Sequence, residues 1–329
     1  MKLGIVGATG LVGSALVQEI LTNVKCVSDL YLFGSIKKDC EWVEISGNRF
    51  IVHNIDSLLS YDLDIILFAA PAEVSKQWIS PLLEKNSQVI VIDGSAAYRT
   101  NPEVPLIIPE INAELIRNHK RIITSPNCTT TLALMALAPL HKAFTLESFE
   151  LFSYQAASGM GKAGLQELEQ QCRCWVNKEQ LPRSVFPRKL LFNAIPQIGI
   201  FDSLGNSEEE QKIVFESRKI LNLSQLPIFA TCVRIPALTC HSISITASFE
   251  AEFTLEDIKR TLKNAPGVKF YDNTYPDVYD ALDNSLCHVG RLRINPIRKN
   301  TLSLWVVGNQ ILKGAATNMR QILEQLLII

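Results

Sequence analysis

A single cysteine stands where the sequence favours covalent catalysis. Cys128 follows a short apolar run and precedes a segment whose apolar residues have helical spacing, within SPNCTTT at positions 125–131. The positive end of a helix dipole favours the thiolate of a cysteine at the helix start. Because an unperturbed thiol has a pKa of about 8.5, catalysis at neutral pH also needs a base or a cation nearby. We therefore predict that Cys128 is a nucleophile with a partner elsewhere in the chain.

His241 is the candidate partner of this cysteine. It follows the tripeptide RIP at 234–236 and opens a run, His241 to Phe249, in which polar and apolar residues alternate. A histidine at this place is either a base for Cys128 or an ordinary hydrogen-bonded residue at the start of a strand. The sequence by itself does not bring the two residues together, so both interpretations stay open.

A glycine-rich segment near the N-terminus indicates nucleotide binding. Gly7, Gly10 and Gly13 stand in GATGLVG, directly after a strand-like run and at the start of a helical pattern. Glycines here permit a tight turn and close approach of the backbone to a pyrophosphate, which the amides of a helix start can hold. The alternative is a strand-to-helix turn that only needs flexible residues. The position between a strand and a helix favours the nucleotide.

The end of the second strand indicates which nicotinamide cofactor is bound. An NAD-selective site carries an acid there that binds the ribose 2'-hydroxyl. This chain instead has Ser35, Lys37 and Lys38, which suit a 2'-phosphate. NADP is therefore the expected cofactor, and the alternative is that these lysines only solvate a loop.

The elements that must position these residues follow two patterns. In the first third of the chain, helical segments alternate with apolar runs that are typical of a parallel sheet buried on both faces. These runs are Leu3–Val6, Leu30–Phe33, Ile65–Ala70, Val89–Ile92 and Ile122–Ile123. Later, the alternation at 241–249 recurs at Leu302, Leu304 and Val306, which indicates a mostly antiparallel sheet with one solvated face. Lys313 to Leu327 is predicted to close the chain as a helix.

The length of 329 residues predicts two domains, because one hydrophobic core usually stops growing below that size. We expect an α/β Rossmann-type nucleotide-binding domain over residues 1–126, completed by the C-terminal helix at 309–329. We expect an α+β catalytic and dimerisation domain with a mostly antiparallel sheet over residues 127–308.

The composition argues against several classes of function. The chain has 32 basic and 33 acidic residues and no basic run, which argues against nucleic acid as a partner. No apolar stretch approaches the roughly 20 residues that cross a bilayer, and no leader-like segment is visible, so no membrane partner and a cytoplasmic location are expected. The eight cysteines have no regular spacing, and the pair Cys172 and Cys174 has no second pair beside it, so no zinc site is expected.

Five segments, taken in order, resemble the aspartate-semialdehyde dehydrogenase family. They are residues 7–13, SPNCTT at 125–130, QAASGMG at 155–161, the stretch from RIP at 234–236 to His241, and KGAA at 313–316. Secondary matches are DGSAAYR at 93–99, FNAIP at 192–196, and EQK at 210–212 ahead of RKIL at 218–221. The resemblance spans nearly the whole chain, and such ordered agreement is more specific than any single motif.

The resemblance implies reversible, NADPH-dependent reductive dephosphorylation of L-aspartyl 4-phosphate to L-aspartate 4-semialdehyde. This reaction belongs to the aspartate pathway to lysine, diaminopimelate, threonine and methionine. Cys128 would attack the acyl phosphate, and the thioester left after loss of phosphate would accept hydride. His241 would serve as general acid and base, and the amide of Gln155 would position the acyl group.

The same motifs imply further site residues. Arg234 would hold the substrate carboxylate through two hydrogen bonds, and Glu210 would face the ammonium group. Phosphate contacts are implied for Arg99, Asn127 and Lys212. Cofactor contacts are implied for Gly7, Thr9, Gly10, Leu11, Val12, Ser35, Lys37, Ser158, Gly159 and Gln310. A charged residue taken singly is more often a solvated surface group.

The chain departs from the family pattern at a few positions. Gly308, Asn309 and Gln310 stand where Ser-Asp-Asn is more usual, which affects the contacts expected with the nicotinamide. The other departures are Ser125, Met160 and Cys240. Cys240 directly precedes His241, so it bears on the packing and redox sensitivity of that histidine.

Two other kinds of function stay open, and the family implies a homodimer or homotetramer. A relative could reduce another acyl phosphate or an acyl-CoA, as N-acetylglutamyl-phosphate reductase and malonyl-CoA reductase do. The first of these typically has Pro-Gly-Cys where this chain has Asn127 before Cys128, and Arg99 and Lys212 suit a small phosphate better than a CoA thioester. A non-catalytic relative would keep the fold alone, but Cys128 and His241 are both present.

Overall fold

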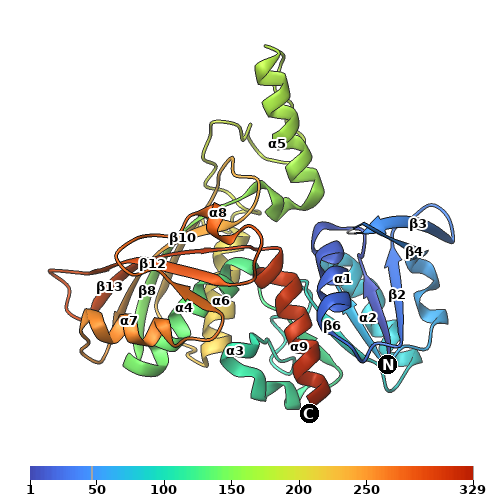
Figure 1. The fold of residues 1–329 in the computed structure, drawn as a ribbon, viewed down its shortest axis with the longest axis horizontal. Helices are drawn as coiled ribbons and strands as arrows, with labels where there is room; N and C mark the ends of the chain where they lie inside the picture. Colours follow the sequence, from blue (N-terminus) through green and yellow to red (C-terminus); the bar gives the residue numbers. More distant parts are fainter. Residues whose placement is uncertain (46, 329) are drawn as a thin grey trace. The chain divides into compact units, whose positions relative to one another are not determined.

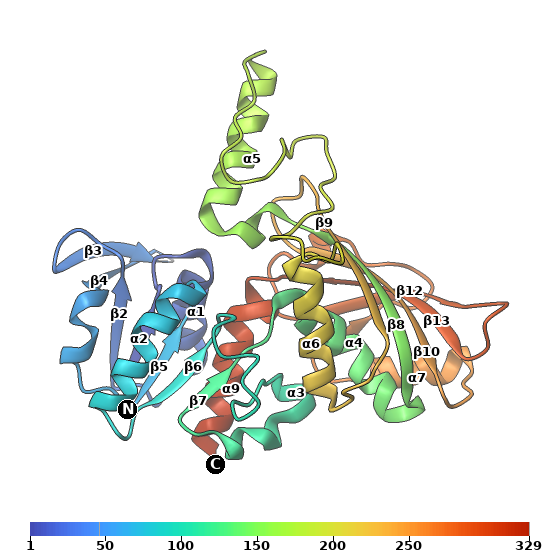
Figure 2. The ribbon, with the colours of Figure 1, turned by 180° about the vertical axis from the view of Figure 1, so that it is seen from behind.

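The computed structural model describes residues 1–45 and 47–328, which form two compact units. The first unit comprises Met1–Asn127 together with the described part of 315–329, and the second comprises Cys128–Gly314. Figures 1 and 2 show the ribbon from opposite sides. Each unit is built on its own β-sheet.

The sheet of the first unit has seven strands in the order β3-β4-β2-β1-β5-β6-β7. Neighbouring strands are parallel except β3 and β4, which form an antiparallel pair. The strands are β1 (Lys2–Val6), β2 (Asp29–Gly34), β3 (Cys40–Ile45), β4 (Asn48–Asn54), β5 (Ile65–Phe68), β6 (Ile90–Asp93) and β7 (Ile122–Thr124).

Helices cover both faces of this sheet. The helices are α1 (Leu11–Asn23), η1 (Ile55–Ser60), α2 (Ala72–Lys85), α3 (Pro109–Asn112), η2 (Ala113–Asn118) and α9 (Thr317–Ile328). Alternate residues of β1 enter different cores: Leu3 and Ile5 pack with residues of α1 and α9, whereas Val6 packs with residues of η1 and α2. Apolar residues on both faces explain why these strands are continuous apolar runs in the sequence.

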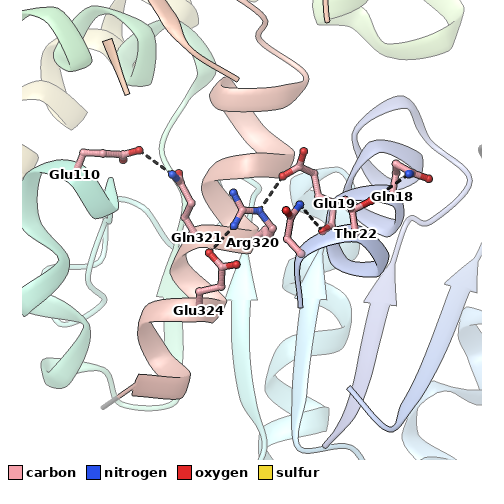
Figure 3. Close-up of polar contacts among 8 residues, drawn as sticks. Gln18, Glu19, Thr22, Glu110, Arg320, Gln321 and Glu324 are labelled. Carbon is pink, nitrogen blue, oxygen red and sulfur yellow. Dashed lines mark hydrogen bonds and ion pairs between the residues drawn. The ribbon is translucent and has the colours of Figure 1, made fainter. Parts of the chain in front are cut away.

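Polar contacts attach the C-terminal helix α9 to the first unit (Figure 3). Arg320 donates from Nε to Oε2 of Glu19 on α1 over 2.8 Å and also pairs with Glu324 one turn along α9. Gln321 donates from its amide to Glu110 on α3 over 2.8 Å. The last helix therefore completes the fold that begins at the N-terminus.

The second unit is built on a six-stranded mixed sheet with the order β11-β12-β13-β10-β8-β9. The three central pairs are antiparallel, and the two outer pairs, β11 with β12 and β8 with β9, are parallel. The strands are β8 (Leu146–Gln155), β9 (Ile228–Arg234), β10 (His241–Phe249), β11 (Val268–Phe270), β12 (Cys287–Ile294) and β13 (Thr301–Gly308).

One face of this sheet is covered by α4, with α6 and α7 beside it. The helical segments are α4 (Cys128–Phe144), η3 (Ala157–Met160), α5 (Gly161–Val176), α6 (Glu208–Leu221), α7 (Leu255–Lys263), α8 (Val278–Ala281) and the π-helical turn η4 (Leu312–Ala316). In both ribbon views α5 projects away from the sheet (Figures 1 and 2). The opposite face has partly exposed hydroxyls, among them Thr246, which hydrogen-bonds to Ser303 over 3.0 Å.

The fold class predicted from the sequence is confirmed, and most predicted strands lie within a residue or two of their expected places. The alternating run at 241–249 is β10, and Leu302, Leu304 and Val306 lie on β13. The boundaries of the two units differ slightly from the expected ones: the chain leaves the first unit after Asn127 and re-enters it at Ala315. Residues 309–314 stay with the second unit since Asn309 donates to the Leu282 carbonyl over 2.7 Å and Gln310 donates to Ser158.

Candidate active site

Cys128 is the first residue of α4 and is partly exposed. A Cβ atom added to Gly314 would lie 2.7 Å from the Cβ of Cys128, so only a glycine allows the backbone at 314 to pass this close. The cysteine thus combines the helix start expected from the sequence with an accessible side chain.

Strand register brings three of the expected residues to one end of the second sheet. Gln155 pairs with Arg234 across β8 and β9, and the pairing of Ser242 with Tyr154 puts His241 beside Gln155. Because side chains alternate along a strand, all three lie on the face that α4 covers. Each is almost fully buried.

Hydrogen bonds connect these strand ends to the start of α4. Gln155 donates from Nε2 to Oε1 of Glu209 over 3.1 Å. The same Gln155 nitrogen lies 3.4 Å from Nε2 of His241. Thr129, which follows Cys128, donates to the same Glu209 oxygen over 3.5 Å. Ser153 donates to Oε1 of Gln155 over 2.9 Å, which fixes the orientation of the amide. Residues far apart in the sequence therefore form one polar cluster beside the cysteine.

His241 is held neutral in this cluster. The pKa of the imidazole is lowered to about 3, chiefly by burial and also by the charge of Arg234, while Glu209 opposes the shift. The Ala156 amide donates to Nδ1 over 3.2 Å, which assigns the proton of the neutral ring to Nε2. His241 can therefore donate a hydrogen bond from Nε2.

Arg234 brings a buried positive charge next to His241. Its Nη1 donates to the Ala156 carbonyl over 2.6 Å. Burial lowers the pKa of the guanidinium, whereas the negative charges of Glu209 and of the Cys128 thiolate raise it. A Cβ on Gly159 would lie 2.6 Å from Nη1 of Arg234 and 3.5 Å from Cε1 of His241, so the glycine leaves room for both side chains.

Glu210, expected at the substrate ammonium, lies elsewhere. Its two carboxylate oxygens accept hydrogen bonds from the Ser207 amide over 2.6 Å and the Cys232 amide over 2.9 Å, so it caps α6 and ties that helix to β9. The neighbouring Glu209 is the carboxylate that contacts Gln155, and its Oε2 lies 3.6 Å from Nζ of Lys212. The structure thus differs from the expectation by one residue, because consecutive helical residues point in different directions.

The signal that identifies Glu209 was present in the sequence. Ser207 and Glu210 have the S-x-x-E spacing of a capping box, which assigns Glu210 to the helix start. Glu209 and Lys212 are three apart on α6 and share a face.

The end of β13 brings Gln310 to Ser158. Gln310 donates from Nε2 to the Ser158 hydroxyl, and its Oε1 is buried with no hydrogen-bond partner within the described residues. A buried carbonyl oxygen without a partner is costly unless a ligand satisfies it. This geometry fits an amide donor such as the carboxamide of a nicotinamide.

Cys240 does not expose a second thiol near His241. It is fully buried against Ala281 and Val307, and burial raises the pKa of its thiol to about 11. Its φ of +64° places it in the left-handed region, where the chain turns into β10. The redox sensitivity considered for this departure from the family therefore has no structural basis in the folded chain.

The glycine-rich segment of the first unit forms a tight cradle. Gly7 has a φ of +81°, and a Cβ there would lie 2.4 Å from the Ala69 carbonyl oxygen. A Cβ on Gly13 would lie 2.0 Å from the Gly7 carbonyl oxygen. α1 begins at Leu11 after the N-cap Gly10, with no side-chain cap and no acid in its first turn. This arrangement suits a pyrophosphate at the helix start, with Thr9, Leu11 and Val12 around it.

Four more predicted site residues lie in the first unit. Arg99 donates to the carbonyls of Ser125 over 2.9 Å and Gly94 over 2.7 Å. Asn127 is buried immediately before Cys128 in the chain. Ser35 and Lys37 are exposed in the loop after β2, where they are accessible to a 2'-phosphate.

Two other kinds of site are absent from the described residues. Within residues 1–45 and 47–328, no group of three or more His, Cys, Asp or Glu side chains is arranged to hold a metal ion. In the same residues no helix has both the length and the apolar character needed to span a bilayer.

Comparison with known proteins assigns both units to one family of domains. Residues 2–119 match the family model of the semialdehyde dehydrogenase NAD binding domain. Residues 137–313 match the model of the semialdehyde dehydrogenase dimerisation domain.

Relatives that match the chain over nearly its whole length are named aspartate-semialdehyde dehydrogenase. An aspartate-semialdehyde dehydrogenase of Aquifex aeolicus is 37% identical over 333 residues, covering 99% of this chain and 97% of the relative. That of Bacillus subtilis is 36% identical over 338 residues, with 99% and 97% covered. The crystal structure of aspartate semialdehyde dehydrogenase II from Vibrio cholerae has a TM-score of 0.94 and 32% identity, with 99% and 98% covered, and a second structure of it is complexed with ASA.

Proposed function

The chain belongs to the aspartate-semialdehyde dehydrogenase family, and on that basis we propose that it reduces L-aspartyl 4-phosphate reversibly to L-aspartate 4-semialdehyde with NADPH. In this proposal a thioester forms on Cys128, and the product serves the synthesis of lysine, diaminopimelate, threonine and methionine. The observation that carries the proposal is the hydrogen-bonded cluster of Thr129, Glu209 and Gln155, with the His241 ring 3.4 Å from the Gln155 amide, beside an accessible Cys128.

The first chemical step is attack by the Cys128 sulfur on the acyl carbon. A carbon–sulfur bond forms, the carbon–oxygen bond to phosphate breaks, and phosphate leaves with the electron pair. The position of Cys128 at the helix start favours the thiolate. The Arg234 guanidinium favours it too, because the Cys128 thiolate and Arg234 attract each other, as the raising effect of the thiolate on the pKa of Arg234 indicates. The Gln155 amide, fixed by Ser153 and Glu209, positions the acyl group.

His241 is the proposed general acid and base, and it acts at the acyl oxygen. In its neutral form the Nε2 proton can be donated to the oxygen that gains negative charge as the thioester forms and is reduced. A substrate carboxylate bound to Arg234 would neutralise the charge that lowers the pKa of His241. Substrate binding would then raise the pKa of the imidazole.

The substrate contacts use the charges in the cluster. Arg234 holds the carboxylate, and Glu209 replaces Glu210 as the partner of the ammonium group. Lys212, which is about one-third exposed, and Arg99 and Asn127 of the first unit contribute to phosphate binding.

The proposed cofactor contacts come from the glycine-rich segment, the loop after β2, and the residues around Ser158 and Gln310. Gly7, Thr9, Gly10, Leu11 and Val12 hold the pyrophosphate, while Ser35 and Lys37 bind the 2'-phosphate. Ser158, Gly159 and Gln310 contact the nicotinamide portion, where the buried Oε1 of Gln310 gains a donor. Bound NADPH supplies the hydride.

The chain is also proposed to work as a homodimer, with a homotetramer as a further assembly. The match of residues 137–313 to a dimerisation domain supports this. Light scattering on the purified full-length chain gives the mass directly, and a mass of one chain at micromolar concentration would contradict it.

The test of the function is phosphate-dependent reduction of the cofactor with L-aspartate 4-semialdehyde, run with NADP and with NAD. We expect turnover that requires phosphate and prefers NADP. Cys128→Ala should abolish turnover and leave NADPH binding intact, whereas Cys26→Ala, which changes an exposed cysteine, is the control and should keep full activity. Activity without phosphate, or activity of the Cys128→Ala variant, would disprove the proposed reaction.

A further inference from the structure

A hollow of about 690 Å³ lies in the second unit, between two stretches of the loop that follows α5. One wall is formed by residues 180–183 and the other by Arg188, Lys189 and Asn193. None of these residues belongs to the cluster around Cys128. Pockets for small molecules commonly have volumes of this order.

Buried polar residues of α5 hold the walls in place, although the loop has no regular secondary structure. Glu167 is 3% exposed and accepts hydrogen bonds from the amides of Ser184, over 2.7 Å, and of Val185. Gln171 is fully buried and donates to the Pro182 carbonyl over 2.9 Å. Its Oε1 accepts from the amides of Leu190 and Leu191 over 3.0 and 2.8 Å. Gln171 therefore anchors both walls, and Glu167 holds the residues that follow the first wall.

Apolar packing adds to this support. Phe186, between the two walls in the sequence, and Leu190, next to Lys189, are buried in a cluster with Leu168 of α5 and Ile195. Such a loop is preorganised, so a ligand in the hollow pays little of the free energy that ordering a mobile loop would cost.

Three positively charged side chains and no carboxylate line the hollow. The side chains of Arg183, Arg188 and Lys189 are exposed and form no hydrogen bond or ion pair within the part of the chain that the structure describes. The residues that line the hollow include these three cations and no Asp or Glu, and the next acid in the sequence is Glu179. Unpaired cations on one fixed surface raise the local positive potential and attract anions.

From these observations we propose that the hollow binds a small molecule carrying two or more negative charges. Two guanidinium groups offer paired donors that match phosphate or carboxylate oxygens, and Lys189 adds a third charge. The Asn193 side chain lies at the same wall and is fixed by its bond to the Lys189 carbonyl over 2.9 Å. The site is separate from the proposed reaction and does not depend on it.

Isothermal titration of the full-length chain with inorganic pyrophosphate and with citrate tests this proposal. The variants are Arg183→Gln/Arg188→Gln, and Lys299→Gln as the control, because Lys299 is an exposed cation in the same unit away from the hollow. Any binding of either anion at the proposed substrate site should be the same in the wild type and in both variants. The difference in affinity between them therefore reports on the hollow alone. Thermal unfolding checks that the variants fold, which is expected because the changed side chains are exposed.

We expect the double variant to bind at least about tenfold more weakly than the wild type, because charge-assisted hydrogen bonds are lost, and Lys299→Gln to bind normally. A stronger effect with pyrophosphate than with citrate identifies a phosphate ligand, and the reverse identifies a polycarboxylate. Equal affinities in all three proteins would overturn the proposal. It would also be overturned if the double variant changed the mass of the assembly and not anion affinity, because the cations would then serve a second copy of the chain.

Discussion

The side-chain amide of Gln155 donates to Oε1 of Glu209 over 3.1 Å, although the two residues come from different elements, the end of β8 and the first turn of α6. This bond fixes the amide at the place where it also approaches His241. It therefore links the orientation of a proposed catalytic group to an acid that also contacts Lys212.

Glu209→Gln should reduce kcat/KM by roughly tenfold or more, because a charge-assisted hydrogen bond to Gln155 and the ion pair with Lys212 are both weakened. The loss should appear with little change in the thermal midpoint. Steady-state kinetics with L-aspartate 4-semialdehyde and phosphate measures the first, and calorimetry measures the second.

Glu210→Gln is the matched control, one residue along the same helix. It removes charged acceptors from the Ser207 and Cys232 amides, so it should lower the free energy of unfolding by about 1–3 kcal/mol. Activity per folded molecule should stay within a few-fold of the wild type. If Glu210→Gln were the variant that lost activity and Glu209→Gln the one that lost stability, the assignment of the two acids would be reversed.

These two acids also show how far sequence analysis reaches. The parallel strands were predictable because residues buried on both faces give continuous apolar runs, as in Ile65–Phe68. β10 was predictable because its two faces have different solvent exposure. β3 was not predicted, since most of its residues are exposed and no apolar pattern marks it.

The sequence predicted which residues belong to the candidate site, but it did not predict the contacts between them. Cys128, Gln155 and His241 stand in recognisable motifs, but only the register of β8 with its neighbours brings Gln155, Arg234 and His241 together. Register depends on pairing over a long sequence separation, which no local pattern encodes. The π-helical turn after β13 was expected as plain helix.

Arg234→Gln should raise the pKa of His241 above its value of about 3, because the arginine charge lowers that pKa. Burial is the larger cause and remains, so the pKa should stay below that of a free histidine. Histidine-selective NMR titration of the wild type and the variant measures the shift. An unchanged or lowered pKa would show that the two charges do not interact.

The buried, neutral His241 should make the folded state sensitive to acid. A histidine in the unfolded chain has a pKa near 6.5, whereas that of His241 is lowered to about 3. The unfolded state therefore takes up the proton first, and this contribution to stability is complete above about pH 6.5 and is lost as the pH falls toward 3. The free energy of unfolding should thus fall less steeply over this window in His241→Gln than in the wild type, as chemical denaturation at several pH values measures. Parallel curves would contradict the lowered pKa.

Lys37→Ala should weaken NADPH binding by roughly tenfold or more and leave NADH binding nearly unchanged, because only NADPH carries the 2'-phosphate that the lysine is proposed to bind. Fluorescence titration with both cofactors measures the two affinities. Lys25→Ala is the control, since Lys25 is also exposed in the first unit and follows α1, away from the loop after β2. Equal losses for both cofactors would mean that Lys37 acts on the loop and not on the phosphate.

The exposure of the cysteines predicts the order in which they react with an alkylating reagent. Cys26, Cys40 and Cys172 are exposed, and Cys128 and Cys174 are partly exposed. Cys232, Cys240 and Cys287 are buried, and burial raises the pKa of the first two well above the ordinary value. Brief alkylation of the native chain, read by peptide mass spectrometry, should therefore modify the first five cysteines and spare the last three until denaturant is added. Inactivation should follow modification of Cys128 and not of Cys26, Cys40 or Cys172. A chain that lost activity while Cys128 remained unmodified would place the reactive thiol elsewhere.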